Sequence, residues 1–382
     1  MKNINWTFWQ AVGTMTGSII GAGILGLPYA LSQNGVLNGL VILVLVGLGI
    51  MTLHLLVGEI VLSTARSHQL TGFANKYLGS AGKWIMFQVF MAASYGSLLA
   101  YLVGGGQVLS AIFGGAPRTW SLIFFVFASV LLYIGLRIIK KIGFVILGAI
   151  LVVVLLIAIA CLNHWELSNL ATYDFSWGTF YAYGVVLYAF LGASAIYQAR
   201  KVLEGQEYLM RKAIMVSNLI PMFLYILFAV VVIGVTGLNT TQVATVGLGA
   251  LVGPEINILG NVFAFLALST SFLTLANAVK ETYFYDFDFA ANVKVDRFIS
   301  WSLTISVPLF LFLLAQNDFI QILNFVGAVA GGLEGLLLLL IYYKLKQQKP
   351  ERPPEYKLKN YRLWLPILFL MMSAGLIYNL IV

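Results

Sequence analysis

Charged residues and cysteines are scarce in this sequence of 382 residues. Only 9% of the residues are charged, whereas a typical soluble domain has about a quarter. Hydrophobic residues make up 60% of the chain. So few charges cannot cover a water-exposed surface, which excludes a soluble globular protein. The single cysteine, Cys161, excludes an intramolecular disulfide. The composition predicts an all-α protein that crosses a lipid bilayer several times.

The motifs of several functional classes are also missing. The three histidines lie far apart, and neither HExxH nor GxSxG occurs, which argues against an intramembrane enzyme. The stretch "GSAGKW" at 79–84 lacks the spacing of a phosphate-binding loop, which argues against a nucleotide-driven pump. Neither a filter repeat nor a charged ring indicates a channel. Since no basic patch is interleaved with aromatic residues, we expect no nucleic-acid partner. We also expect no cofactor.

Long apolar segments make up most of the sequence. A membrane-spanning helix needs about 20 apolar residues. Eleven segments meet this requirement: 7–32, 36–62, 84–113, 119–138, 142–163, 177–199, 211–237, 255–279, 298–315, 318–343 and 362–381.

The basic residues predict the orientation of these spans. If the N-terminus is cytoplasmic, only Arg118 of the 22 basic residues falls on the outer side. The positive-inside rule then places the C-terminus outside, in a plasma or inner membrane. The hydrophilic segment 344–361 is expected to be a cytoplasmic linker that precedes an eleventh helix in 362–382. We expect a monomer or a weak oligomer.

The first span carries an unusual interruption, "GSIIGAGILGLP" at 17–28, with four glycines and a proline. Glycine and proline are the poorest helix formers. The glycines could provide a face for close helix packing. Alternatively, the helix is discontinuous and its free backbone groups bind a ligand. Small residues also interrupt the span 177–199, at Gly192-Ala193-Ser194. Paired interruptions of this kind favour a discontinuous helix at a transporter's binding site.

Each interruption lies in the first span of one half of the chain. The first ten spans form two groups of five, in 7–163 and 177–343, and an odd number per group inverts the second group. We therefore expect a ten-helix core, 1–343, built as an inverted repeat.

The half-helix that begins near Gly23 would direct its amides and positive dipole at a carboxylate. The carbonyls around Ile19–Ile20 and Phe190–Leu191 would suit a cation or an ammonium group. An α-amino acid carries both charges.

Four stretches of the sequence resemble the amino acid/auxin permease family, and in particular its bacterial branch of hydroxy and aromatic amino acid permeases. They are "GSIIGAGILGLPYAL" (17–31), "FANKYLGSAGKW" (73–84), "YGSLLAYLVGGG" (95–106) and "LALSTSFLTLA" (266–276). The resemblance implies the LeuT-type fold and secondary active uptake of amino acids by alternating access. An amino acid sensor that shares the fold but does not transport remains an alternative.

The candidate substrate-binding residues line the two interruptions. Tyr95, Tyr101 and Tyr188 could line the cavity, and the resemblance favours Tyr95 among them. The lining is apolar and carries no charge, which predicts a neutral L-amino acid. The full set is Gly21, Ala22, Gly23, Ile24, Tyr95, Phe190, Leu191, Gly192, Ala193 and Ser194.

A polar helix face suggests how transport is coupled to an ion. Thr270, Thr274 and Asn277 follow a helical spacing in the span 255–279. Such hydroxyls often bond their own helix, but they are also hard ligands suited to a small cation. The resemblance implies a sodium site made by the carbonyls of Gly17 and Ile20 with the hydroxyls of Ser269 and Thr270. Proton-coupled relatives place a lysine in the fifth span, and none lies between residues 143 and 162 here.

Glu334 provides the competing hypothesis. It lies within the tenth span, and an acidic residue inside the bilayer is costly enough to suggest a functional role. A carboxyl group at this position could carry a proton. Because the fifth span has no lysine, sodium is the predicted coupling ion. A proton carried by Glu334 is the alternative.

Overall fold

The computed structural model describes residues 4–33, 35–65, 68–134, 139–171, 181–286, 293–314 and 318–381, and these residues contain helices but no strands. The α-helices are α1 (Ile4–Ile19), α2 (Gly23–Gln33), α3 (Val36–Ser63), α4 (Leu70–Phe113), α5 (Pro117–Ile134), α6 (Ile139–Cys161), α7 (Tyr181–Phe190), α8 (Ser194–Val202), α9 (Met210–Thr236), α10 (Ala244–Val252), α11 (Pro254–Asp286), α12 (Val293–Leu314), α13 (Phe319–Phe325), α14 (Gly332–Gln347) and α15 (Tyr361–Ile381). A π-helical segment, η6 (Val326–Gly331), joins α13 to α14. The 3₁₀ turns are η1 (Leu162–His164), η2 (Leu167–Leu170), η4 (Glu207–Leu209) and η5 (Gly237–Asn239).

Most of the expected spans are present as long apolar helices. Within the described residues, nine helical segments are long and apolar enough to cross a membrane, and the bent pair α1–α2 makes a tenth. The remaining expected span, 142–163, falls on α6 and η1, and the fully described part of it is the apolar helical segment Leu151–His164. Ten spans are therefore supported by length and composition, and the eleventh stays a prediction.

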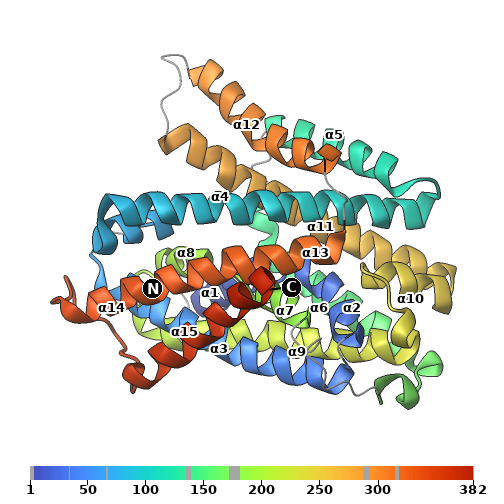
Figure 1. Ribbon diagram of the computed structural model, residues 1–382, viewed down its shortest axis with the longest axis horizontal. Helices are drawn as coiled ribbons and strands as arrows, with labels where there is room; N and C mark the ends of the chain where they lie inside the picture. The colour runs from blue at the N-terminus through green and yellow to red at the C-terminus, as the bar shows by residue number, and fades with distance from the viewer. Residues whose placement is uncertain are drawn as a thin grey trace.

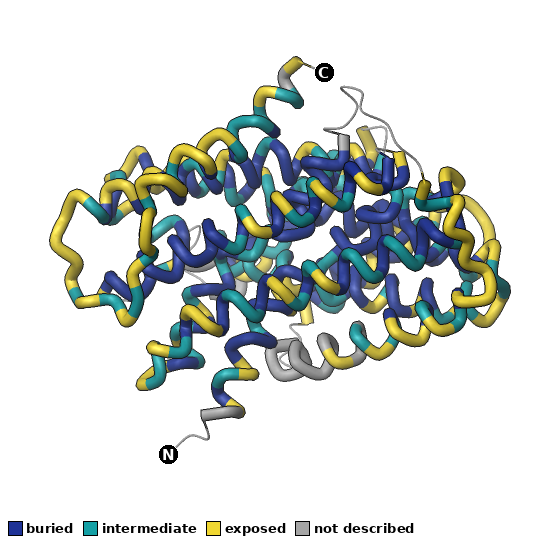
Figure 2. The backbone as a smooth tube through the Cα atoms, turned by 90° about the horizontal axis from the view of Figure 1, so that it is seen from below, coloured by how far each residue is buried: buried dark blue, intermediate teal, exposed yellow. Residues whose placement is uncertain are grey.

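The helices form a layered bundle around a buried centre. The long helix α4 crosses the molecule between α5 and α12 on one side and α14, α3 and α9 on the other (Figure 1). Buried residues lie in the middle of the bundle and exposed residues at its periphery (Figure 2). The apolar window of α15 is only 17% buried, against 72% for the segment Ala182–Val202. The last helix therefore lies at the outside of the bundle, where it packs on α14 and α3.

A glycine kink separates the long helix α4 into two parts. Gly79 has a φ of 76° and a ψ of −169° inside the helix, a conformation that favours glycine because it has no Cβ. The kink lies within the stretch 73–84, which carries part of the family resemblance. It separates a short amphipathic start from the span that follows, so the apolar part begins close to the expected residue 84.

The hydrophilic segment after the tenth span is not a free linker. Helix α14 continues to Gln347, and residues 348–360, here called the strap, pack against the end of α3. Glu59 of α3 is only 2% exposed and forms an ion pair with Lys346 at 2.5 Å. The same carboxylate accepts hydrogen bonds from the Tyr342 hydroxyl at 2.8 Å and from the Leu358 amide at 2.9 Å. A buried carboxylate thus attaches the strap to the core.

The strap also joins the end of α3 to the start of α4. Glu351 pairs with Lys76 at 2.5 Å and accepts a hydrogen bond from the Ala65 amide at 2.8 Å. These two bonds hold the pKa of the Glu351 carboxyl below its ordinary value. The Tyr356 hydroxyl donates to the Leu55 carbonyl at 2.7 Å, and burial raises the pKa of Tyr356 well above its ordinary value. The strap, which is far from both helices in the sequence, therefore bridges the end of α3 and the start of α4.

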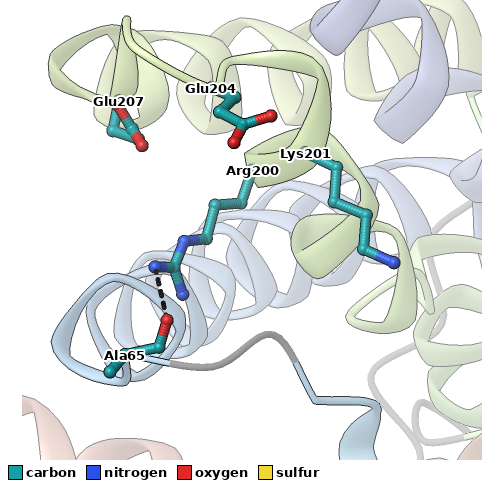
Figure 3. Close-up of a pocket in the computed structure, with 5 residues that line it drawn as sticks. All are labelled: Ala65, Arg200, Lys201, Glu204 and Glu207. Carbon is teal, nitrogen blue, oxygen red and sulfur yellow. Dashed lines mark hydrogen bonds between the residues drawn. The ribbon is translucent and has the colours of Figure 1, made fainter.

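Arg200 of α8 holds the same end of α3. Its guanidinium donates to the carbonyls of Val61 at 2.5 Å and Thr64 at 2.8 Å, and to that of Ala65 at 3.5 Å. A cation at the end of a helix satisfies free carbonyls and complements the helix dipole. The side chain extends from α8 toward Ala65 at the edge of a cavity of about 190 Å³ that Lys201, Glu204 and Glu207 complete (Figure 3). The half-helix α8 is thereby linked to α3 and, through Ala65, to the strap.

The Glu59 ion pair gives a first testable prediction. Glu59→Gln keeps the size of the side chain but leaves Lys346 without its buried partner. Loss of one member of a buried pair costs about 3–5 kcal/mol, so we expect the free energy of unfolding in detergent to fall by about 3 kcal/mol. Glu204→Gln, which changes an exposed carboxylate, is the matched control and should leave stability unchanged. Equal stability of the two variants would show that Glu59 does not hold the strap.

Candidate functional site

The first membrane helix is interrupted at its glycine-rich centre. Residues 20–22 are not helical, and the axes on either side, Trp6–Ile19 and Gly23–Gln33, are bent by 54°. The break was expected at Gly21–Gly23, and α2 already begins at Gly23. None of the amides from Gly21 to Ile24 donates a backbone hydrogen bond to another described residue. These amides form the positive N-terminal end of α2.

A second interruption separates α7 from α8. Residues 191–193 are not helical, and α8 begins at Ser194, so the break lies one residue before the expected position. The amides of Gly192, Ala193 and Ser194 donate no backbone hydrogen bond within the described part of the chain. Leu191, Gly192 and Ser194 are half-buried, whereas Ala193 is buried. Both discontinuous helices predicted from the small residues are therefore present.

Two glycines allow the interrupted helices to cross in direct contact. A Cβ on Gly23 would lie 2.6 Å from the Cα of Ala189 on α7. A Cβ on Gly192 would lie 2.6 Å from the Cγ1 of Ile19 on α1. Real Cβ atoms do not approach other atoms so closely, so glycine is needed at both positions. The first break packs against α7, which ends at the second break, and the second break packs against α1, which ends at the first. Close packing and interruption, considered as alternatives from the sequence, occur together.

Tyr225 of α9 bridges the two crossing helices. Its hydroxyl lies 3.0 Å from the Ile19 carbonyl and 2.8 Å from the Ala189 carbonyl. Its ring is fully buried and packs edge-on against Phe190, with centroids 5.3 Å apart. Ile19 is one of the residues whose carbonyls the sequence suggested for a cation or an ammonium group, and Ala189 directly precedes the other pair, Phe190–Leu191. Sequence reasoning missed Tyr225, because a single tyrosine in an apolar span gives no local signal.

Polar side chains surround the open side of the first break. A Cβ on Gly21 would lie 3.6 Å from the Ser271 Oγ of α11 and 3.7 Å from the Tyr101 hydroxyl of α4, both ordinary contact distances. The Tyr188 hydroxyl of α7 donates to the Tyr101 hydroxyl at 3.2 Å. Two hydroxyl groups, from α4 and α11, therefore lie close to Gly21, and a third, from α7, is bonded to one of them.

Two of the expected lining side chains lie away from this polar group. The Tyr95 hydroxyl bonds to the Tyr283 hydroxyl at 2.7 Å and to the Leu303 carbonyl at 3.3 Å, so this residue joins α4 to α11 and α12. Tyr101, six residues later on another face of α4, lies beside Gly21 instead. Phe190 is fully buried, and a Cβ on Gly47 of α3 would lie 2.9 Å from its ring. Its side chain belongs to the core behind the breaks.

The predicted sodium ligands come from α1 and its break and from α11, and their surroundings differ. Ser269 is 8% exposed, and its Oγ has no hydrogen-bond partner among the described residues. Thr270 bonds within its own helix, to the carbonyls of Leu266 at 2.8 Å and Ala267 at 3.1 Å. Gly17 is exposed while Ile20 is buried. The Gly17 face of α1 is thus not covered by α11.

Glu334, the candidate proton site, lies one helical turn from the second break. A Cβ on Gly331 at the end of η6 would lie 2.9 Å from the Leu191 Cδ2, and Glu334 follows three residues later in α14. The residue is half-buried. Glu334 therefore lies one turn after a residue that contacts the second break.

Comparison with known proteins identifies the family. Residues 5–380 match the model of the tryptophan/tyrosine permease family. Glutamine transporter 2 of Aliivibrio fischeri is 23% identical over 91% of this chain and 92% of its own length. Tyrosine-specific transport system 1 of Haemophilus influenzae is 26% identical over 92% of this chain and 89% of its own length.

A solved structure shows the same fold. The crystal structure of MhsT in complex with L-phenylalanine matches with a TM-score of 0.67 and 16% identity, covering 100% of this chain and 98% of that one. The expected LeuT-type fold and the permease resemblance are confirmed. Since the relatives are transporters and permeases, the expectation that the chain is not an enzyme also holds. This chain is an amino acid transporter of the membrane and belongs to the tryptophan/tyrosine permease family.

Proposed function

We propose that this protein takes up neutral L-amino acids by alternating access, coupled to sodium, and that the substrate binds between the two breaks. The observation that carries the proposal is the free amide end of α2 at Gly21–Ile24, beside the hydroxyls of Tyr101 and Ser271. The substrate carboxylate would lie on the amides of Ala22, Gly23 and Ile24, because a helix N-terminus favours an anion.

Neutral side chains near the breaks support a neutral substrate. Tyr101, Tyr188, Leu191 and Ser271 approach the breaks and carry no charge. The ammonium group of the substrate would lie against the carbonyls of Phe190 and Leu191, where α7 ends. The relatives are named for glutamine and tyrosine transport, and the solved structure holds phenylalanine. All three are neutral amino acids.

The exposed face of α1 supports sodium coupling. A sodium ion between the carbonyls of Gly17 and Ile20 and the hydroxyls of Ser269 and Thr270 would close α1 onto α11. The free Oγ of buried Ser269 is suited to this role. Binding of the ion would then favour a substrate-ready state, and substrate would tighten the binding of sodium by the same factor, since coupling of this kind is reciprocal.

Two alternatives follow from other observations. Glu334 lies one turn from the second break, so a proton on its carboxyl group could replace sodium as the coupling ion. The protein could also bind an amino acid without transporting it, and would then accumulate none in vesicles.

The distribution of charge supports a cytoplasmic strap. Lys76, Arg200, Lys346 and Arg352 gather where α3 ends and the strap packs. The positive-inside rule favours the cytoplasm for this end. The N-terminus would then be cytoplasmic and the C-terminus outside, in a plasma or inner membrane.

The two glycines of the first break should respond differently to the same change. Gly21→Ala adds a methyl group at ordinary contact distance, so the protein should fold normally but bind amino acids more weakly, by about tenfold. Gly23→Ala forces a methyl group against Ala189 and should lower the melting temperature. Radiolabelled amino acid binding and thermal unfolding in detergent would measure both effects. If Gly21→Ala binds as well as the wild type, the substrate does not lie over the first break.

The transport proposal is tested by uptake into proteoliposomes with sodium and proton gradients imposed separately. The labelled panel would contain L-phenylalanine, L-tyrosine, L-glutamine and L-serine, with L-glutamate and L-lysine as charged controls. We expect sodium-driven uptake of one or more neutral amino acids and none of the charged ones. Uptake driven by a pH gradient alone, and uncoupled by Glu334→Gln, would establish the proton alternative. Binding without accumulation would establish the sensor.

Ser269→Ala tests the sodium site directly. Sodium should tighten substrate binding to the wild type by about 5- to 150-fold, and the variant should lose most of this factor. Ser300→Ala is the matched control, because Ser300 is also a buried serine whose Oγ has no partner among the described residues, but lies on α12. A sodium effect that survives in Ser269→Ala would contradict the proposed site.

A further inference from the structure

The hydroxyl of Tyr225 lies at the point where the two interrupted helices cross. It is 3.0 Å from the Ile19 carbonyl, at the end of α1, and 2.8 Å from the Ala189 carbonyl, one residue before the end of α7. A tyrosine hydroxyl has one hydrogen, so the two carbonyls share a single donor. The bridge connects the last turns of both half-helices to a third helix, α9.

The same two residues pack against a glycine at the opposite break. Ile19 packs against Gly192 in the second break, and Ala189 packs against Gly23 at the first. Tyr225 therefore bonds to the backbone at both contacts of the crossing. Its side chain is held in place, because the ring is fully buried and packs edge-on against Phe190.

Electrostatics explains why a donor is needed here. The carbonyl end of a helix carries about half a negative charge, and α1 and α7 both end at the crossing. Two such ends in a buried place repel each other and leave acceptors without partners, which is costly. The Tyr225 hydroxyl offsets this cost without a net charge. It also occupies the position that the two carbonyl ends would otherwise offer to a cation.

We propose that Tyr225 is a positioning residue for substrate binding. It fixes the spacing of the two breaks, so that the free amides of α2 and the end of α7 are ready for the substrate before it arrives. Because a preorganised site loses less free energy on binding, removal of the hydroxyl should weaken substrate affinity. The inference rests on the substrate site proposed above.

The first test does not require a substrate. Tyr225→Phe keeps the ring and removes only the bridge, and Tyr183→Phe is the matched control, because the Tyr183 hydroxyl of α7 donates to the Met371 carbonyl of α15. Hydrogen exchange at the amides of Ile20 and Leu191, which end α1 and α7, should become about tenfold faster in Tyr225→Phe. Exchange at Ile20 should be unchanged in Tyr183→Phe. Unchanged exchange at both amides in Tyr225→Phe would show that the Tyr225 hydroxyl does not hold the two helix ends together, and would overturn the inference.

The second test measures binding of tritiated L-tyrosine and L-glutamine to purified protein. Tyr225→Phe should raise the dissociation constant about tenfold with the number of sites unchanged, and Tyr183→Phe should stay within about twofold of the wild type. A lower melting temperature with unchanged affinity would mean a purely structural role and would overturn the inference. If the wild type binds neither amino acid, the proposed substrate site fails, and the exchange result alone decides whether Tyr225 tethers the breaks.

Discussion

Backbone amides and carbonyls inside a membrane protein need partners, because the bilayer core offers none. This constraint governs the two interrupted helices, α1–α2 and α7–α8. Each break frees polar groups where a continuous helix would have satisfied them. The structure satisfies some of these groups, with Tyr225 at the carbonyls of Ile19 and Ala189. Among the described residues it gives the amides from Gly21 to Ile24 no backbone acceptor, and we propose that these amides bind an anionic group.

The surrounding structure supports the breaks from a distance. Arg200, at the far end of the half-helix α8, holds the last carbonyls of α3. The end of α3 is also bonded to the strap through Ala65 and buried Glu59, and the strap in turn reaches Lys76 on α4. A displacement of α8 on substrate binding would therefore also displace the end of α3 and the strap. Hydrogen bonds and ion pairs around the end of α3 thus connect the half-helix α8 with the helices around it.

The sequence predicted the breaks to within one residue, because glycine and small residues weaken a helix locally and this signal needs no tertiary information. The resemblance favours Tyr95 over Tyr101, whereas in the structure the Tyr101 hydroxyl lies beside Gly21. The rotation of α4 that decides this depends on packing against α11 and α12, which the sequence does not reveal. It gave no indication of Tyr225, whose partners are 206 and 36 residues away. The composition of residues 344–361 predicts a linker, because polar composition does not reveal the buried carboxylate of Glu59 that attaches the strap.

A structure determined with a bound neutral amino acid would test the central claim most directly. The account predicts a ligand between the two breaks, with its carboxylate within hydrogen-bond distance of the amides of Ala22, Gly23 and Ile24. It also predicts that both helices remain interrupted and that the Tyr225 hydroxyl stays between the carbonyls of Ile19 and Ala189. A ligand bound elsewhere in the bundle, or a helix that becomes continuous through either break, would contradict the account.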